Sequence, residues 1–178
     1  MWRVERYDSP MTDTASSDKQ RAHLRIADRL RQQAEDVRRL TAGLEEETIA
    51  KRTIPEKWSL KELVCHLLRV QQVFEKRLDA LLAKEDPEIV SYEPEGDSEF
   101  PGVVALPAEK SLAEFLSGRR RLILRLERLS PSDWHRAGRH PEYPHYDVHF
   151  AMEYMAHHEA HHIYQMYQRR APLARPPH

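Results

Sequence analysis

Apolar residues recur every three or four positions in four long segments of the chain, which cover residues 18–44, 59–84, 111–129 and 147–170. This spacing puts the apolar side chains on one face of an α-helix. Gly43 stands near the end of the first segment, and glycine commonly ends a helix because it tolerates a left-handed backbone. Four amphipathic helices of this length predict an all-α fold, a four-helix bundle with the apolar faces turned inward.

Three of the expected helices have recognisable starts. Ser59 and Glu62 have the spacing of a capping box, in which each side chain accepts a hydrogen bond from the other residue's backbone amide. Ser111 and Glu114 repeat that spacing, and Asp147 is a suitable N-cap for the last helix. These residues predict helices that begin directly after Ser59, Ser111 and Asp147.

The connection between the second and third helices, residues 85–108, contains four prolines and two glycines and shows no helical period. More than twenty residues is long for a turn between adjacent antiparallel helices. We therefore expect a long crossover connection between helices 2 and 3 that lets these two helices run parallel. The same segment could fold over one end of the bundle and line a pocket.

The chain is expected to form a single domain over residues 19–170. Residues 1–18 are predicted to be a flexible N-terminal segment, and Met11 is an alternative start to Met1. Residues 171–178 are rich in proline and are predicted to be a disordered tail.

Charge and composition exclude several classes of function. A net charge of −1 gives no overall attraction to nucleic acid or to an anionic membrane, and the run 119–121 of three arginines is expected to be a solvated helix face. No apolar run approaches the roughly 18–20 residues of a membrane span. Cys65, the single cysteine, rules out an internal disulfide and is expected to be a small buried apolar residue. We expect a cytoplasmic protein that binds neither nucleic acid nor membrane.

The fourth helix carries candidate metal ligands. Four of the eleven histidines are packed into residues 157–162, and they form two i, i+4 pairs. His158 and His162 lie on the apolar stripe of this helix, which favours them as a pair facing the core. His157 and His161 lie on a row with aromatic residues that could also be partly buried. An incidental histidine-rich surface is the other interpretation.

His66 is the best candidate for a third ligand, because it lies alone on the edge of the apolar face of the second helix. Catalytic zinc sites use three protein ligands and leave one position open. A lone histidine there could equally be an ordinary core residue. Three loop histidines are weaker candidates that could line a pocket, and three others are expected to face water. The loop set is His135, His140 and His145, and the water-facing set is His23, His149 and His178.

Residues 158–162 match the H-E-x-x-H pattern of zinc peptidases. The longer peptidase pattern requires Gly and His at positions 165 and 168, where this chain has Gln165 and Gln168. A peptidase is therefore disfavoured. Glu159 is kept as a candidate catalytic residue, either as the base that activates water or as a partner to a histidine.

Two segments resemble the DinB/YfiT-like superfamily. Residues 57–67 read KWSLKELVCHL and resemble its W-S-hydrophobic-x-E-x-x-x-H-L segment, while residues 158–166 read HEAHHIYQM and resemble its H-[DE]-x-x-H-x-x-Q-hydrophobic segment. The similarity spans about residues 19–170. It implies a four-helix bundle with a crossover, often a homodimer, and a divalent metal ion, usually Zn or Ni, held by three histidines and water.

Carried onto this chain, the resemblance implies that His66, His158 and His162 are the metal ligands. Members of the superfamily include transferases and isomerases that use low-molecular-weight thiols, and many hydrolases of unassigned substrate. We therefore expect a metal-dependent hydrolase or thiol-dependent transferase acting on a small molecule. A non-catalytic helical module for binding or assembly, with a structural or incidental metal site, is the alternative.

Overall fold

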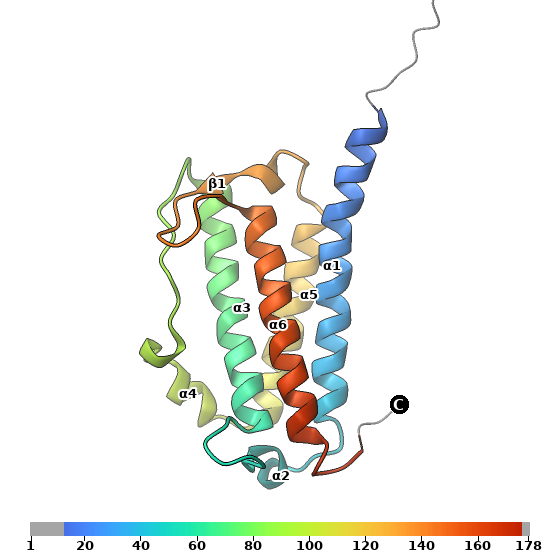
Figure 1. Ribbon diagram of the computed structural model, residues 1–178, viewed down its shortest axis with the longest axis vertical. Helices are drawn as coiled ribbons and strands as arrows, with labels where there is room; N and C mark the ends of the chain where they lie inside the picture. The colour runs from blue at the N-terminus through green and yellow to red at the C-terminus, as the bar shows by residue number, and fades with distance from the viewer. Residues whose placement is uncertain (1–12, 176–178) are drawn as a thin grey trace, which may run out of the picture.

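The computed structural model describes residues 13–175, with side chains from residue 22 onward. Four long helices form a bundle: α1 (Asp13–Thr41), α3 (Leu60–Ala83), α5 (Ala108–Leu126) and α6 (Val148–Arg170) (Figure 1). The all-α four-helix bundle predicted from the apolar periodicity is confirmed. Residues 13–18, expected to be flexible, lie in α1, and residues 1–12 and 176–178 are outside the described part of the chain.

Short elements join the long helices. They are α2 (Glu46–Ala50), the 3₁₀ helix η1 (Pro94–Gly96), α4 (Phe100–Val104), the 3₁₀ helix η2 (Asp133–His135), and the strands β1 (Ala137–Gly138) and β2 (Tyr146–Asp147). The two strands pair antiparallel. Gly138 is needed there, because a Cβ at this position would lie 2.7 Å from the carbonyl oxygen of Pro87. No described helix is long and apolar enough to span a membrane.

The helix directions follow from the contacts between helices. Gln71 of α3 donates to the carbonyl of Phe115 in α5 at 3.3 Å, and Asp79, about two turns further along α3, pairs with Arg125. Residue numbers therefore increase in the same direction along α3 and α5, so these helices are parallel. The crossover predicted from the length of the connection is confirmed.

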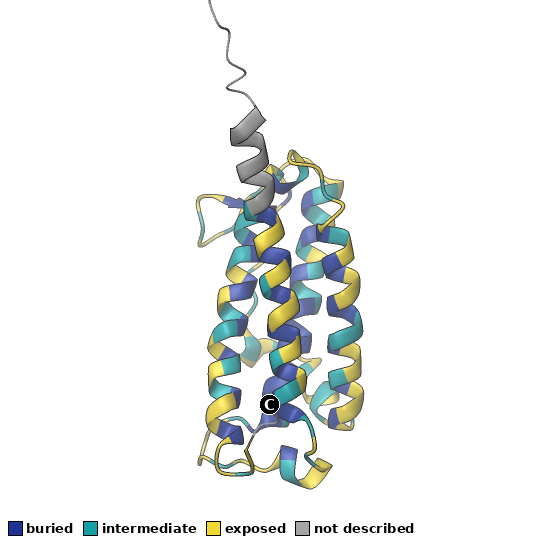
Figure 2. Ribbon diagram, turned by 90° about the vertical axis from the view of Figure 1, so that its right-hand side faces the viewer, coloured by how far each residue is buried: buried dark blue, intermediate teal, exposed yellow. Residues whose placement is uncertain are grey.

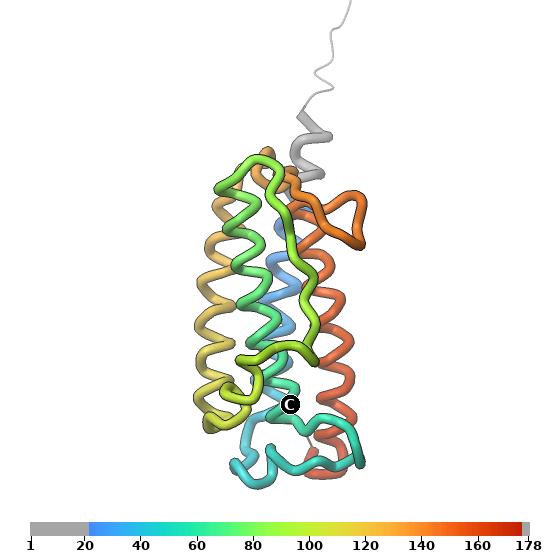
Figure 3. The backbone as a smooth tube through the Cα atoms, turned by 90° about the vertical axis from the view of Figure 1, so that its left-hand side faces the viewer, coloured from blue at the N-terminus to red at the C-terminus, as the bar shows by residue number. Residues whose placement is uncertain are grey.

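The crossover, residues 84–107, runs along the side of the bundle over α3 and α6 (Figure 3). Arg69 Nε lies 2.9 Å from Asp97 Oδ2, and Arg77 donates to the carbonyl of Val90 at 2.7 Å. Two arginines of α3 thus hold the crossover at two points. It lines a cavity, as the sequence suggested, although along the side of the bundle and not over one end.

Two of the three predicted helix starts are confirmed. The Ser59 amide donates to Glu62 Oε2 at 2.7 Å and the Glu62 amide donates to Ser59 Oγ at 3.2 Å, which completes the capping box. Asp147 Oδ1 accepts from the Phe150 amide at 2.7 Å. Gly43, with φ of 70°, follows the end of α1 as expected.

The predicted start at Ser111 is wrong, because α5 begins three residues earlier, at Ala108. The Ala108 amide donates to the Glu46 carboxylate at 2.8 Å, so this helix is capped from α2 and not by a local serine. Ser111 is fully buried inside the first turns of the helix.

Each long helix buries one stripe and exposes the other (Figure 2). The apolar residues form two clusters, one around Leu78 and Trp134 and the other around Leu40 and Phe115. The arginine run 119–121 was expected to be solvated. This is wrong for Arg119, whose side chain is only 1% exposed. It lies on the helix face of Phe115 and Leu122, which the bundle encloses on all sides.

Two further expectations need correction. His23 was expected at the surface, but it is buried with its ring stacked 4.5 Å from that of Trp134. The tail expected to be disordered begins with a described turn, in which Ala174 donates to the carbonyl of Arg170 and Leu173 packs against the core. The expectation for His178 lies outside the described residues.

Candidate metal centre

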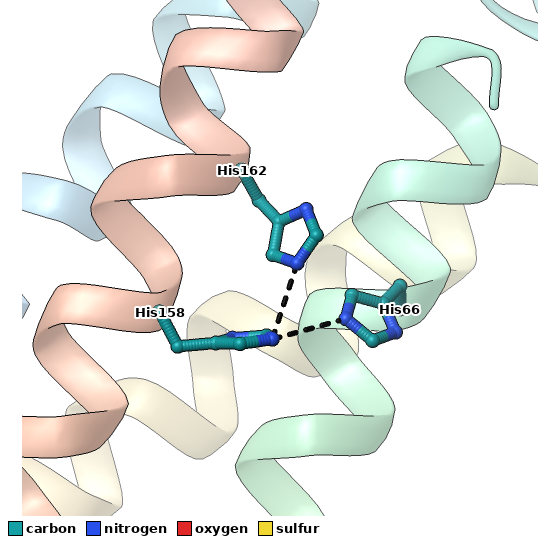
Figure 4. Close-up of side chains that lie close together, drawn as sticks. All are labelled: His66, His158 and His162. Atoms are coloured by element: carbon teal, nitrogen blue, oxygen red, sulfur yellow. Dashed lines mark hydrogen bonds between the residues drawn. The ribbon is translucent and has the colours of Figure 1, made fainter. Parts of the chain in front are cut away.

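Three histidines from two helices meet inside the bundle. His66 comes from α3, and His158 and His162 come from α6 (Figure 4). The Nε2 atom of His158 lies 3.4 Å from Nε2 of His66 and 3.1 Å from Nε2 of His162. One nitrogen from each ring lies within 4.8 Å of the others. The structure therefore brings together the three residues that the sequence singled out.

The spacing of these nitrogens fits a single metal ion. Zinc–nitrogen bonds of about 2.0–2.1 Å in tetrahedral geometry place ligand nitrogens roughly 3.3 Å apart. Two of the three separations, 3.1 and 3.4 Å, bracket that value. Within the described residues, no cysteine, aspartate or glutamate joins the cluster as a fourth ligand. The described residues thus offer three candidate ligand atoms, which would leave a fourth position on a bound ion open.

The surroundings keep all three imidazoles uncharged. Burial, followed by the proximity of His162 and His158, lowers the pKa of His66 to about 3. Burial and the neighbouring His162 lower the pKa of His158 to about 4, and burial also lowers the pKa of His162. A histidine must be unprotonated to bind a metal ion, so the site is ready for a cation at neutral pH.

Residues around the trio fix the ring orientations. His162 Nδ1 lies 2.9 Å from Gln165 Oε1, a contact that requires a proton on Nδ1 and leaves the Nε2 lone pair facing the other two rings. The ring of Trp58 lies 4.8 Å from that of His66. Neither Gln165 nor Trp58 was expected at the site from the residue pattern, although Gln165 lies one turn after His162.

The alternative pair on α6 does not face the core. His157 and His161 are exposed, which decides between the two i, i+4 pairs that periodicity left open. Among the loop histidines, His140 lines a cavity beside His158, whereas His135 and His145 are exposed. His149, expected to face water, is half-buried beside His23 and Trp134.

Glu159 lies away from the trio. Its two carboxylate oxygens accept hydrogen bonds from Arg119 at 2.8 and 2.5 Å, and both side chains are almost completely buried, at 2% and 1% exposed. A carboxylate held on both oxygens by a buried guanidinium is not available to activate water. The geometry therefore does not support the catalytic role considered for Glu159. The glutamate that the peptidase pattern requires as a base is thus not available in this protein.

Two cavities reach the histidines from different directions. One, of about 230 Å³, is lined by His158, by α3 and by the aromatic residues of the crossover and of the loop before α6. The other, of about 240 Å³, is lined by His162, Trp58 and Lys57 with Gln165 and Arg169. Each cavity is therefore bordered by one of the two histidines of α6.

The fold and the trio together define a helical bundle with a candidate three-histidine metal centre. The chain belongs to the DinB superfamily, whose family model matches residues 29–166. Among solved structures it is similar to YfiT from Bacillus subtilis, described as a probable metal-dependent hydrolase with an unusual four-helix bundle topology. That similarity has a TM-score of 0.64 at 18% identity and covers 96% of this chain and 95% of YfiT. A search of curated proteins found no match.

Proposed function

We propose that the protein is a metal-dependent enzyme of the DinB/YfiT type that uses Zn or Ni bound by His66, His158 and His162. The observation that carries this proposal is the convergence of three buried imidazoles, with two Nε2–Nε2 separations of 3.1 and 3.4 Å and no fourth ligand among the described residues. Imidazole suits both metals, so the ligand set does not choose between them. YfiT, which has the same fold, is described as a probable metal-dependent hydrolase.

A metal ion in such a site lowers the pKa of a bound water or thiol and so supplies a nucleophile at neutral pH. The protein's own residues prepare the site for this. Gln165 holds the His162 ring in the tautomer that directs Nε2 inward. The crossover, fixed to α3 by Arg69 and Asp97, covers the side of the bundle where His158 borders the aromatic cavity.

The two cavities favour group transfer as a second candidate reaction. Hydrolysis needs room for one organic substrate and water, whereas transfer needs room for two organic molecules. His158 borders one cavity and His162 borders the other, so two molecules could approach the trio from different sides. A low-molecular-weight thiol is the expected second substrate. The expected oligomeric state is a homodimer, and the expected location is the cytoplasm.

A non-catalytic module is the competing class. A structural zinc site normally closes its shell with four protein ligands. The described residues supply only three, beside two cavities, and this arrangement supports catalysis over a purely structural role.

The test is metal analysis of the full chain purified without a histidine tag, followed by refilling with Zn or Ni after chelation. Wild type should bind about one equivalent, and His66→Ala and His158→Ala should bind almost none. His157→Ala is the matched control, because it removes an exposed histidine one residue away from a ligand. Absence of stoichiometric metal in wild type, or His66→Ala refilling as well as wild type, would refute the proposal.

A second measurement separates hydrolase from transferase. Metal-loaded protein is assayed on activated esters, amides and electrophiles, with and without small thiols. Turnover that depends on both metal and thiol supports transfer, and metal-dependent turnover without thiol supports hydrolysis. Full metal occupancy with no turnover in either screen would favour the non-catalytic module.

A further inference from the structure

The aromatic cavity beside His158 continues away from the trio along α3. His66, Val70, Phe74 and Arg77 follow one another at helical spacing on one face of this helix, and the last three line the cavity. Arg77 stands eleven residues after His66, which is about 16 Å along the helix axis. Val70 and Arg77, the outer two of the lining residues on α3, lie about 10 Å apart along the helix axis, and the wall of the cavity includes both His158 and Arg77.

Aromatic rings form much of the wall of this cavity. The ring of Tyr154, on α6, lies 6.1 Å from that of Phe74 on α3 and 5.6 Å from that of Tyr143. Tyr146 lies next to Arg77, and Tyr92 of the crossover closes another side. Walls of this kind favour a flat, apolar ligand body that stacks against the rings.

Arg77 is a half-buried cation without a carboxylate partner among the described side chains. It donates to Tyr146 Oη at 3.2 Å and to the carbonyl of Val90 at 2.7 Å. A guanidinium has five N–H groups in a fork that fits a carboxylate or phosphate, so three donors remain. A charge in this position is stabilised when an anion binds it.

The polar side chains of His140 and Glu142 also line the cavity, and the first offers a donor to an anion. His140 Nδ1 accepts from the Glu142 amide at 3.2 Å, so the neutral ring carries its proton on Nε2 as a donor. Burial and the nearby Arg77 lower the pKa of His140, which keeps the ring neutral. Glu142, the one carboxylate that lines the cavity, is exposed and accepts from the hydroxyl of Ser91.

We propose that this cavity binds a slender organic anion, with a carboxylate-type group at Arg77, a flat apolar body along the tyrosines and its reactive group at the histidine trio. The placement of the ligand's reactive group rests on the proposed function, because the proposed metal centre is what would react with that group. Binding of the anionic end depends on Arg77 and the aromatic wall and does not require a metal ion.

The test uses three probes of the same shape and different charge: 4-phenylbutyrate, its neutral amide and 4-phenylbutylamine. Binding is measured by calorimetry on the metal-free full chain and again on the Zn-loaded protein. The carboxylate should bind about tenfold more tightly than the amide, the amine should bind most weakly, and the order should hold without metal. Equal binding of the three probes, no binding, or carboxylate binding only with Zn would overturn the proposal.

Variants locate the anion. Arg77→Met should lose about tenfold or more in carboxylate affinity and should barely change binding of the amide, whereas Arg77→Lys should lose less. Arg120→Met is the matched control, since Arg120 is exposed on α5 outside the cavity. Unchanged carboxylate binding in folded Arg77→Met would overturn the proposal. The probe series on wild type decides the question if that variant does not fold.

The two proposals can fail separately. Anion binding by protein that holds no metal would leave this inference standing and remove the proposed function. Stoichiometric metal without selective anion binding would do the reverse.

Discussion

Replacing Glu159 by alanine distinguishes a structural role for this residue from a catalytic one. The change leaves the Arg119 guanidinium, 1% exposed, without its carboxylate. Two charge-assisted hydrogen bonds, of 2.8 and 2.5 Å, are lost. Each such bond contributes about 1.5–3 kcal/mol, and an uncompensated buried charge costs about 3–5 kcal/mol in total.

We therefore expect Glu159→Ala to lower the free energy of unfolding by about 3–5 kcal/mol. In a chain of this length that corresponds to a fall in melting temperature of roughly 10 °C. The double variant Arg119→Met/Glu159→Met should recover about 2 kcal/mol or more of this loss, because it removes both charges and keeps an apolar side chain against Phe115. Recovery should be incomplete, since Gln71 and the carbonyl of Leu30 lose the donor that Arg119 provides.

The assay is urea unfolding of metal-free protein, with metal refilling and turnover measured on the folded variants. The matched control is Glu35→Ala, which removes an exposed carboxylate paired with Arg38 and should leave the unfolding curve unchanged. Two results would refute the reasoning. One is Glu159→Ala within about 1 kcal/mol of wild type, below the range for breaking a buried pair. The other is a folded, metal-loaded Glu159→Ala whose turnover alone is abolished.

Three further predictions concern the site and the helix starts. Gln165→Leu should weaken metal affinity about 10- to 100-fold in a chelator competition, because it frees the His162 ring, and unchanged affinity would contradict the orienting role. Since the pKa of His66 is lowered to about 3 and that of His158 to about 4, the unfolded chain takes up protons first as pH falls below about 6.5. The free energy of unfolding of the metal-free protein should then fall between about pH 6.5 and 4. The fall should be shallower in His66→Gln, and equal dependence on pH in the two proteins would argue against this reasoning. Ser59→Ala should lower the free energy of unfolding in urea by about 1 kcal/mol. Loss of the Glu46 carboxylate should weaken the start of α5, because that carboxylate caps the Ala108 amide. Loss of the Ser111 hydroxyl should not, because Ser111 does not cap this helix.

The features that could be predicted from sequence are those encoded by nearby residues. Apolar periodicity predicts the four helices, and the capping box at Ser59 and Glu62 is a local arrangement that the structure confirms. The inner position of His158 and His162 also follows from periodicity, since they continue the apolar stripe of α6. The placement of His66 on the inner edge of α3 comes from the same pattern.

The features that could not be predicted depend on contacts between distant segments. Nothing near Ala108 in sequence shows that Glu46 caps it, because the two meet only in the folded bundle. Periodicity also cannot show that the charged residues Arg119 and Glu159 form an ion pair inside the core. His23 is similar, since its burial depends on a stacked ring more than one hundred residues away.

The crossover contributes the cavity wall at Ser91, Tyr92 and Pro94, yet none of the three converging nitrogens comes from it. Part of the cavity wall therefore comes from a segment that carries none of the three histidines, while Phe74, Arg77 and Tyr154 line the cavity from the helices that do. Insertions or exchanges between residues 84 and 107 can remodel this part of the cavity wall while the helical scaffold keeps the spacing of the three histidines. A bundle built in this way is well suited to diversify its chemistry in evolution, and the same segment is the natural place for an engineer to redirect its selectivity.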